Sequence, residues 1–118
     1  MYIRTKDGIY KVESTLRDNG IVKGYNVGEI GFIRKDQVIK QSENLEELCD
    51  RFVVMDKETK EVIDIVYFLE YAKLWSYCKY NIYGAIWTDF GLKYVAKMND
   101  KGDLELIWNK KEFMLEII

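Results

Sequence analysis

The clearest pattern along the chain lies between Ile82 and Trp108, where three apolar runs alternate with two short polar breaks. The breaks, at 88–91 and 99–102, each end in a glycine. Glycine adopts positive φ without steric cost, so both breaks are typical of hairpin connections. The pattern predicts a three-stranded antiparallel meander over 82–108.

Residues 65–79 follow the period of a helix instead, with apolar positions recurring at about 100° per residue. One apolar stripe holds Ile65, Phe68, Leu69, Ala72 and Trp75, and a second holds Tyr67, Tyr71, Leu74 and Cys78. Together the stripes cover roughly 220° of arc, about twice what a helix on one sheet needs. We therefore expect one long helix packed on the meander, with apolar surface left uncovered. A buried β-segment is the competing interpretation, but polar residues interrupt its alternation.

Two shorter elements precede this helix. Asn44, followed three residues later by Glu47, has the spacing of a capping box and predicts a short helix over 42–50. The apolar runs 52–55 and 61–63 flank a polar segment and predict a hairpin.

The N-terminal third of the chain contains short β-prone runs and several glycines, and 31–39 predicts a strand, a tight helical turn and a second strand. This stretch resembles the end of an SH3-type small barrel. Gly31, Phe32, Ile33 and Val38 fit that pattern, whereas Arg34 replaces its proline and Gln37 its tyrosine. The resemblance implies a small barrel, and the two replacements remove residues of the groove that binds proline-rich peptides.

These elements predict an α+β fold. We expect an SH3-like β-rich unit over 1–42 and, over 43–118, a unit that combines helices with the antiparallel sheet. A chain of 118 residues corresponds to one domain, so the two units should form one compact body.

Composition argues against catalysis, because the chain contains no histidine. Histidine is the usual general base near neutral pH and the commonest zinc ligand, so nucleophilic catalysis and zinc chemistry are disfavoured. We expect no enzyme activity and no cofactor. The two cysteines, Cys49 and Cys78, do not form a CxxC pair and are expected to be reduced thiols.

No apolar run is long enough to span a membrane, and the N-terminus lacks the order of a secretory signal, so a cytoplasmic protein is expected. The net charge is −2, and 41–70 alone carries −6, from three basic and nine acidic residues. This distribution lacks the positive excess typical of a general nucleic-acid binder.

Acidic residues are concentrated at one place in this segment, comprising Glu43, Glu46, Glu47 and Asp50. A solvated surface is the simplest interpretation, and contact with a basic partner is a second. A Mg²⁺ or Mn²⁺ site is a third, since hard cations prefer oxygen ligands, but we expect no metal.

A single-stranded nucleic acid could stack on aromatic residues and pair with lysines along the meander. The residues concerned are Trp87, Lys93, Tyr94, Lys97, Lys101, Trp108, Lys110 and Lys111. This is the alternative to the function that we favour.

The favoured function is protein binding through the second helical stripe. Interfaces are rich in aromatic residues and poor in charge, which makes Tyr67, Tyr71, Leu74 and Tyr77 the candidate contact residues. Packing of this stripe inside the protein is the competing interpretation. The partner would be a host or phage protein, or a second copy in a homodimer.

Several segments resemble segments of short proteins from Firmicute phages and prophages; they are 2–10, 38–41, 44–53, 82–89 and 91–99. The resemblance implies a bacterial cytoplasm and an accessory role, and it assigns no site residues. Together with the apolar stripe, it leads us to expect a protein that modulates or inhibits a host or defence protein.

Overall fold

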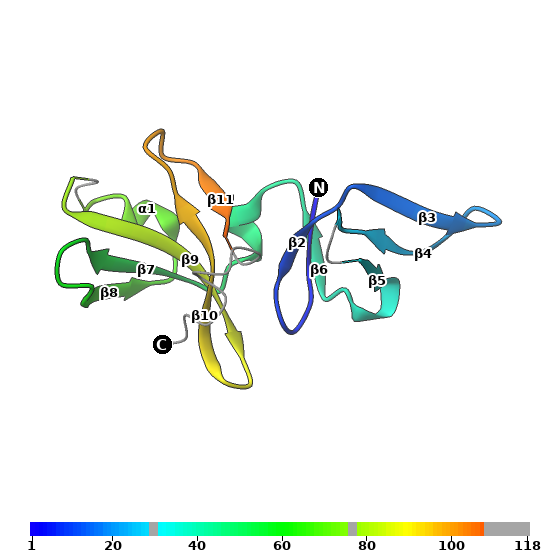
Figure 1. The fold of residues 1–118 in the computed structure, drawn as a ribbon, viewed down its shortest axis with the longest axis horizontal. Helices are drawn as coiled ribbons and strands as arrows, with labels where there is room; N and C mark the ends of the chain where they lie inside the picture. The colour runs from blue at the N-terminus through cyan, green and yellow to red at the C-terminus, as the bar shows by residue number, and fades with distance from the viewer. Residues whose placement is uncertain (29–30, 76–77, 108–118) are drawn as a thin grey trace. The chain divides into compact units, whose positions relative to one another are not determined.

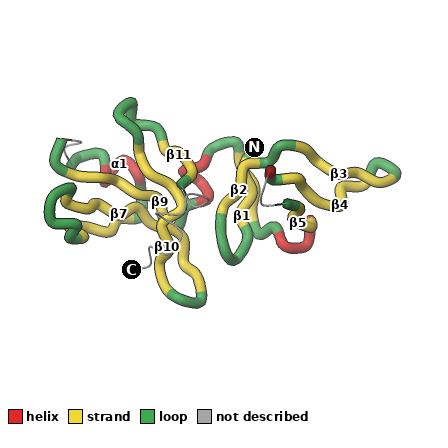
Figure 2. The backbone as a smooth tube through the Cα atoms, in the orientation of Figure 1, coloured by secondary structure: helices red, strands yellow, loops and turns green. Residues whose placement is uncertain are grey.

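The structure is a computed structural model that describes residues 1–28, 31–75 and 78–107. Its chain divides into two compact units, Met1–Leu48 and Cys49–Ile118, here called the N-terminal and C-terminal units. Figures 1 and 2 trace the strands of each unit. The described part of the chain is mostly β, with 52% of its residues in strands. No helix in the described ranges is long and apolar enough to cross a membrane.

The N-terminal unit contains two three-stranded sheets. One has the order β2-β1-β6 and the other the order β3-β4-β5. The first consists of β1 (Tyr2–Arg4), β2 (Ile9–Lys11) and β6 (Lys40–Ser42), and the second of β3 (Ser14–Asp18), β4 (Ile21–Asn26) and β5 (Phe32–Arg34).

Local sequence sets the connections of these strands. Asn19 and Gly20 both have positive φ, 51° and 80°, as the two central residues of the β3–β4 hairpin require. The 3₁₀ turn η2 (Lys35–Gln37) connects β5 to β6. The strand and the tight turn predicted from 31–39 are therefore present, but the second strand begins only at Lys40, after the predicted stretch. Ile3, Ile9 and Ile33 are buried between the strands.

The helix predicted over 42–50 is a short 3₁₀ turn, η3 (Leu45–Leu48), and it belongs to the N-terminal unit. Asn44 Oδ1 accepts the Glu46 N–H at 3.1 Å, which is a capping contact. In a capping box the Glu47 carboxylate would accept the backbone N–H of Asn44. Here it accepts the Ser42 hydroxyl at 2.6 Å instead.

The C-terminal unit is built on one five-stranded antiparallel sheet with the order β11-β10-β9-β7-β8. Its strands are β7 (Arg51–Asp56), β8 (Val62–Val66), β9 (Tyr80–Thr88), β10 (Gly91–Met98) and β11 (Leu104–Leu106). The predicted meander corresponds to β9, β10 and β11, and its turn glycines, Gly91 and Gly102, have φ of 112° and 87°. The predicted hairpin before it corresponds to β7 and β8.

The predicted α+β fold with a long helix is wrong. Residues 65–66 belong to strand β8, and the α-helix in the described part of this segment is α1 (Leu69–Ala72), of four residues. β-Branched residues dominate 62–66, and their restricted χ1 favours a strand, which pairs with β7. The helical spacing predicted for this segment is present only in α1, where Leu69 and Ala72 are both buried.

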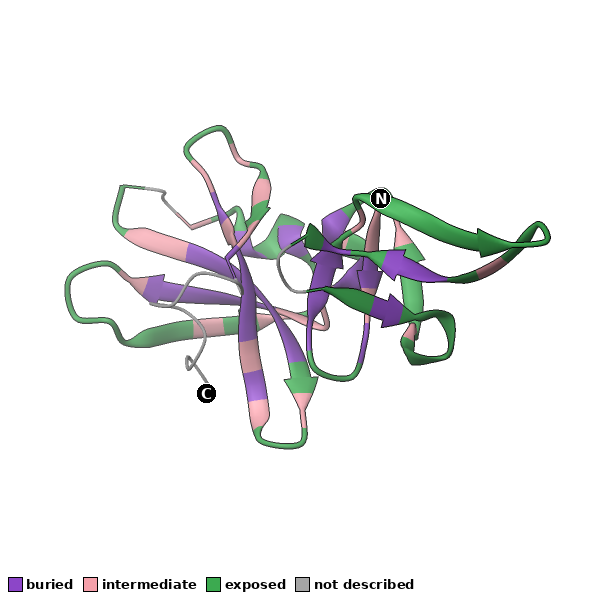
Figure 3. Cartoon of the chain, turned by 45° about the vertical axis from the view of Figure 1, so that its right-hand side comes forward, coloured by how far each residue is buried: buried purple, intermediate pink, exposed green. Residues whose placement is uncertain are grey.

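Buried residues are concentrated in the central strands of the five-stranded sheet (Figure 3). Consecutive residues of these strands are buried, so both faces of the sheet carry buried side chains. Phe52, Val54 and Ile82 cluster with the two buried residues of α1. Val53 and Leu92 belong to a second cluster, which contains no residue of α1. Helix α1 therefore packs with the first of the two clusters.

Candidate protein interface

Strands β7 and β9 and the residue that follows β8 place Arg51, Trp87 and Tyr67 next to one another; we call these three residues the Arg51 cluster. Arg51 pairs with Ala85 of β9, and Trp87 follows two residues later on the same face. Phe52 pairs with Val66, so Tyr67, the next residue, lies beside Arg51. The antiparallel register thus joins residues far apart in the sequence.

The guanidinium of Arg51 lies against two aromatic rings. Its Cζ is 3.9 Å from the ring centroid of Tyr67 and 5.9 Å from that of Trp87. Such cation–π contacts contribute about 0.5–1 kcal/mol at exposed sites. Its Nη1 also donates to the Asp50 carbonyl oxygen at 2.7 Å. These contacts hold the planar guanidinium of Arg51, which has further N–H donors, beside the exposed rings of Tyr67 and Trp87.

Asp50 positions one side of this cluster. Its N–H donates to the Ala85 carbonyl oxygen at 2.8 Å, and its Oδ2 accepts the Trp87 N–H at 2.8 Å. The side chain therefore continues the ladder between β7 and β9 where backbone pairing ends. This contact gives Asp50 a structural role.

Large apolar side chains are exposed at several positions along the segment that contains β8 and α1. We call them the β8–α1 surface, which consists of Ile63, Ile65, Tyr67, Phe68, Tyr71 and Leu74. Tyr67 is 65% exposed, Tyr71 52% and Leu74 82%. Grouped exposure of this kind marks interaction sites on soluble proteins, whereas single exposed apolar residues are common.

The predicted contact residues fall on different parts of this surface. Tyr67 contacts Arg51, whereas Tyr71 makes an edge-to-face contact with Phe68, with ring centroids 5.8 Å apart. Leu74 follows α1 and is exposed. Tyr77 lies outside the described residues.

The four predicted acidic residues do not belong to one element. Glu43, Glu46 and Glu47 lie in the N-terminal unit, and Asp50 lies in the C-terminal unit. The Glu43 carboxylate lies 3.3 Å from the N-terminal amine, and the Glu47 carboxylate accepts a hydroxyl. Within the described ranges, no group of three or more acidic, cysteine or histidine side chains could hold a metal ion.

The alternative nucleic-acid surface loses its central aromatic residue. Tyr94 is only 3% exposed, and its ring stacks on that of Tyr83 with centroids 4.8 Å apart. Lys97 extends over the same Tyr83 ring, with its Nζ 6.0 Å from the centroid. A base therefore cannot stack on Tyr94. Trp108, Lys110 and Lys111 lie outside the described residues.

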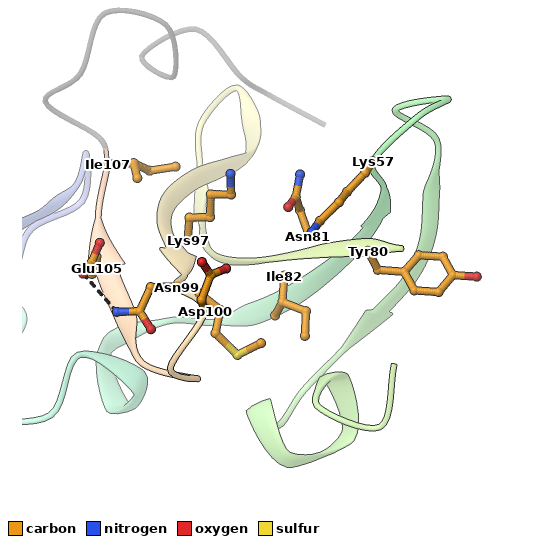
Figure 4. A pocket seen from close by; sticks show the side chains of 10 residues that line it. Lys57, Tyr80, Asn81, Ile82, Lys97, Asn99, Asp100, Glu105 and Ile107 are labelled. Carbon is orange, nitrogen blue, oxygen red and sulfur yellow. Dashed lines mark hydrogen bonds between the residues drawn. The ribbon is translucent and has the colours of Figure 1, made fainter. Parts of the chain in front are cut away.

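A polar cavity of about 370 Å³ opens at the other end of the sheet (Figure 4). Lys57, Asn81 and Lys97 line it from neighbouring segments, together with Asp100 and Glu105. The Asn99 amide donates to Glu105 Oε1 at 2.9 Å across one side. The lining carries both positive and negative side chains, so it suits a small polar molecule.

Two titrating groups are perturbed by structural contacts. Backbone N–H donation from Thr59 and Glu58 lowers the pKa of Asp56, which sits in the β7–β8 turn. Burial raises the pKa of Tyr10, and the nearby Asp7 charge adds to that effect. Both shifts arise from folding contacts and neither lies in the Arg51 cluster.

Sequence reasoning missed Arg51 and the exposed residues of β8. Arg51 is one of three basic residues in an acidic segment, and its aromatic partners lie in other parts of the chain, so no local pattern indicates the cluster. The exposure of Ile63 and Ile65 depends on β8 being the last strand of the sheet.

Comparison of the chain with known protein families, with curated proteins and with solved structures gave no match.

Proposed function

We propose that this chain is a non-catalytic accessory protein that binds another protein through the β8–α1 surface. The observation that carries the proposal is the exposure of six large apolar side chains between residues 63 and 74. Burying such a surface removes apolar area from water, which favours association. The long helix predicted from the sequence is absent from the described residues, so the argument for binding rests first on this exposure.

The Arg51 cluster adds a polar anchor to the apolar surface. Arginine, tyrosine and tryptophan are the residue types that dominate binding energy at interfaces. Contacts with two rings restrain the Arg51 side chain, so its guanidinium can donate to a partner carboxylate or carbonyl at a low cost in side-chain entropy.

The biological setting belongs to the same proposal. Resemblance of several segments to short phage and prophage proteins supports an accessory role in a bacterial cell. A host or defence protein is then the expected partner, and modulation or inhibition of that protein is the expected effect.

Affinity capture from a bacterial lysate tests this proposal. The Tyr71→Asp variant places a charge on the β8–α1 surface, whereas the control Phe90→Asp replaces an exposed aromatic ring outside that surface. Partner capture should be lost with Tyr71→Asp and retained with Phe90→Asp. A folded Tyr71→Asp protein that keeps every partner and its oligomeric state would remove the proposal.

The nucleic-acid alternative makes a different prediction for the same protein. Retention on single-stranded DNA should then weaken steeply as salt rises, because phosphate contacts release counterions. The burial of Tyr94 argues against this alternative.

A further inference from the structure

Strand β8 is the edge of the five-stranded sheet, and in the described residues its only pairing is with β7. An edge strand presents one row of backbone donors and acceptors that no neighbouring strand uses. Its side chains Ile63 and Ile65 are each about 40% exposed. This edge is long enough and apolar enough to accept a further strand.

One hydrogen bond shows which backbone groups point outward. The N–H of Ile65 donates to Oδ1 of Asp64 at 2.9 Å, so it points away from β7. Backbone groups alternate along an antiparallel strand, so those of Asp64 and Val66 point toward β7. The outward group of Ile65 is thus occupied by a neighbouring carboxylate that can be displaced.

A second copy of this chain is a poor occupant of the edge. Residues 62–66 read Val-Ile-Asp-Ile-Val in either direction. Antiparallel pairing of two copies about the centre of this segment would place two Asp64 side chains directly opposite one another. Like charges in that position destabilise a strand pair, whereas opposite charges stabilise it. Asp64 therefore favours a partner strand that carries a cation.

We propose that β8 binds an extended segment of the partner protein as a sixth strand, with a lysine or arginine opposite Asp64. The partner cation draws the Asp64 carboxylate away from the Ile65 N–H, which then donates to a partner carbonyl. The exposed side chains of Ile65 and Tyr67 contact the added strand on one face. This inference rests on the proposed function and specifies the chemistry of its partner.

Two synthetic peptides test the inference on the unmodified full chain. Both peptides are short, have blocked termini and alternate valine with threonine. They differ at the central position, which is lysine in one peptide and glutamate in the other. The lysine peptide should shift the backbone amide NMR signals of Ile65 and Tyr67 and bind about ten-fold more tightly than the glutamate peptide. Equal affinities, shifts confined to other strands, or the absence of binding would each overturn the inference.

Two variants test the roles of individual atoms. Ile65→Pro removes the outward N–H without removing a bond to β7, and the control Ile65→Ala removes the same side chain but keeps the N–H. Peptide binding should be lost only in Ile65→Pro. Asp64→Asn keeps an acceptor for Ile65 and removes the charge, so it should bind both peptides alike. Retained discrimination in Asp64→Asn would overturn the inference even if Ile65→Pro fails to fold.

Lysate capture separates this inference from the proposed function. Loss of the partner with Tyr71→Asp but not with folded Ile65→Pro would overturn strand addition and leave binding through the β8–α1 surface intact. Retention with both variants would overturn both proposals. Loss with both, and retention with Ile65→Ala, is the result that strand addition predicts.

Discussion

The backbone of Gly84 in β9 lies against the thiol of Cys49. A Cβ at position 84 would be 2.7 Å from Cys49 Sγ and 3.3 Å from the Cβ of Ala96. Cys49 also packs with the cluster that contains α1. The cysteine therefore fills space that glycine leaves on this face of the sheet.

We expect Gly84→Ala to destabilise the protein by about 1–2 kcal/mol, because the added methyl group overpacks the site. In a Cys49→Ala background the same change should cost much less, since the sulfur is gone. Urea unfolding of the two single variants and the double variant measures the difference. Additive effects would show that the two residues do not share this space.

Hairpins were the elements that local sequence predicted well. Gly91 and Gly102 have positive φ that other residues adopt only with strain, so each fixes a turn regardless of the surroundings. The helix predicted over 65–79 is wrong because the apolar period of the segment fits a helix, while its first residues belong to β8, which pairs with β7. Periodicity could not indicate that Phe52 and Val66 face each other.

Only the residue types of the candidate site could be predicted from the sequence; their arrangement could not. The sequence predicts Tyr67, Tyr71 and Leu74 on one helix face, whereas the structure places them after strand β8, in the short helix α1 and in the segment that follows it. Arg51 joins Tyr67 through sheet register alone. No pattern within one segment contains that relationship.

The contact between Arg51 and Tyr67 should appear as an energetic coupling. Arg51→Gln, Tyr67→Leu and the double variant form a cycle, in which we expect about 0.5–1 kcal/mol of coupling in the free energy of unfolding. The control cycle of Arg51→Gln with Tyr71→Leu should be additive, because Tyr71 contacts Phe68 instead. Equal coupling in both cycles would contradict the assigned contact.

Acid should weaken the β7–β8 turn through Asp56. Its folded pKa lies below its ordinary value of 3.8, so the unfolded chain takes up the proton first as pH falls. The stabilisation is complete above about pH 5 and decreases below about pH 4. Asp56→Asn keeps an acceptor oxygen and does not titrate. Unfolding free energies of the two proteins should therefore converge in acid; a constant difference from pH 7 to pH 3 would refute this assignment.

Lys60 occupies the left-handed region with φ of 65°. Lys60→Gly should stabilise the protein, by up to about 1 kcal/mol, because glycine adopts this conformation without strain. The control Glu58→Gly should destabilise it, since position 58 does not have positive φ and glycine adds freedom to the unfolded chain. Thermal unfolding compares the two. Destabilisation by both variants to the same degree would contradict strain at Lys60.

The most direct measurement of the central claim is hydrogen exchange of the captured complex compared with the free protein. Binding through the β8–α1 surface predicts that amides of 62–74 gain protection, while those of the β9–β10 turn at 89–90 exchange as before. Unchanged exchange over 62–74, with protection elsewhere in the chain, would contradict the account.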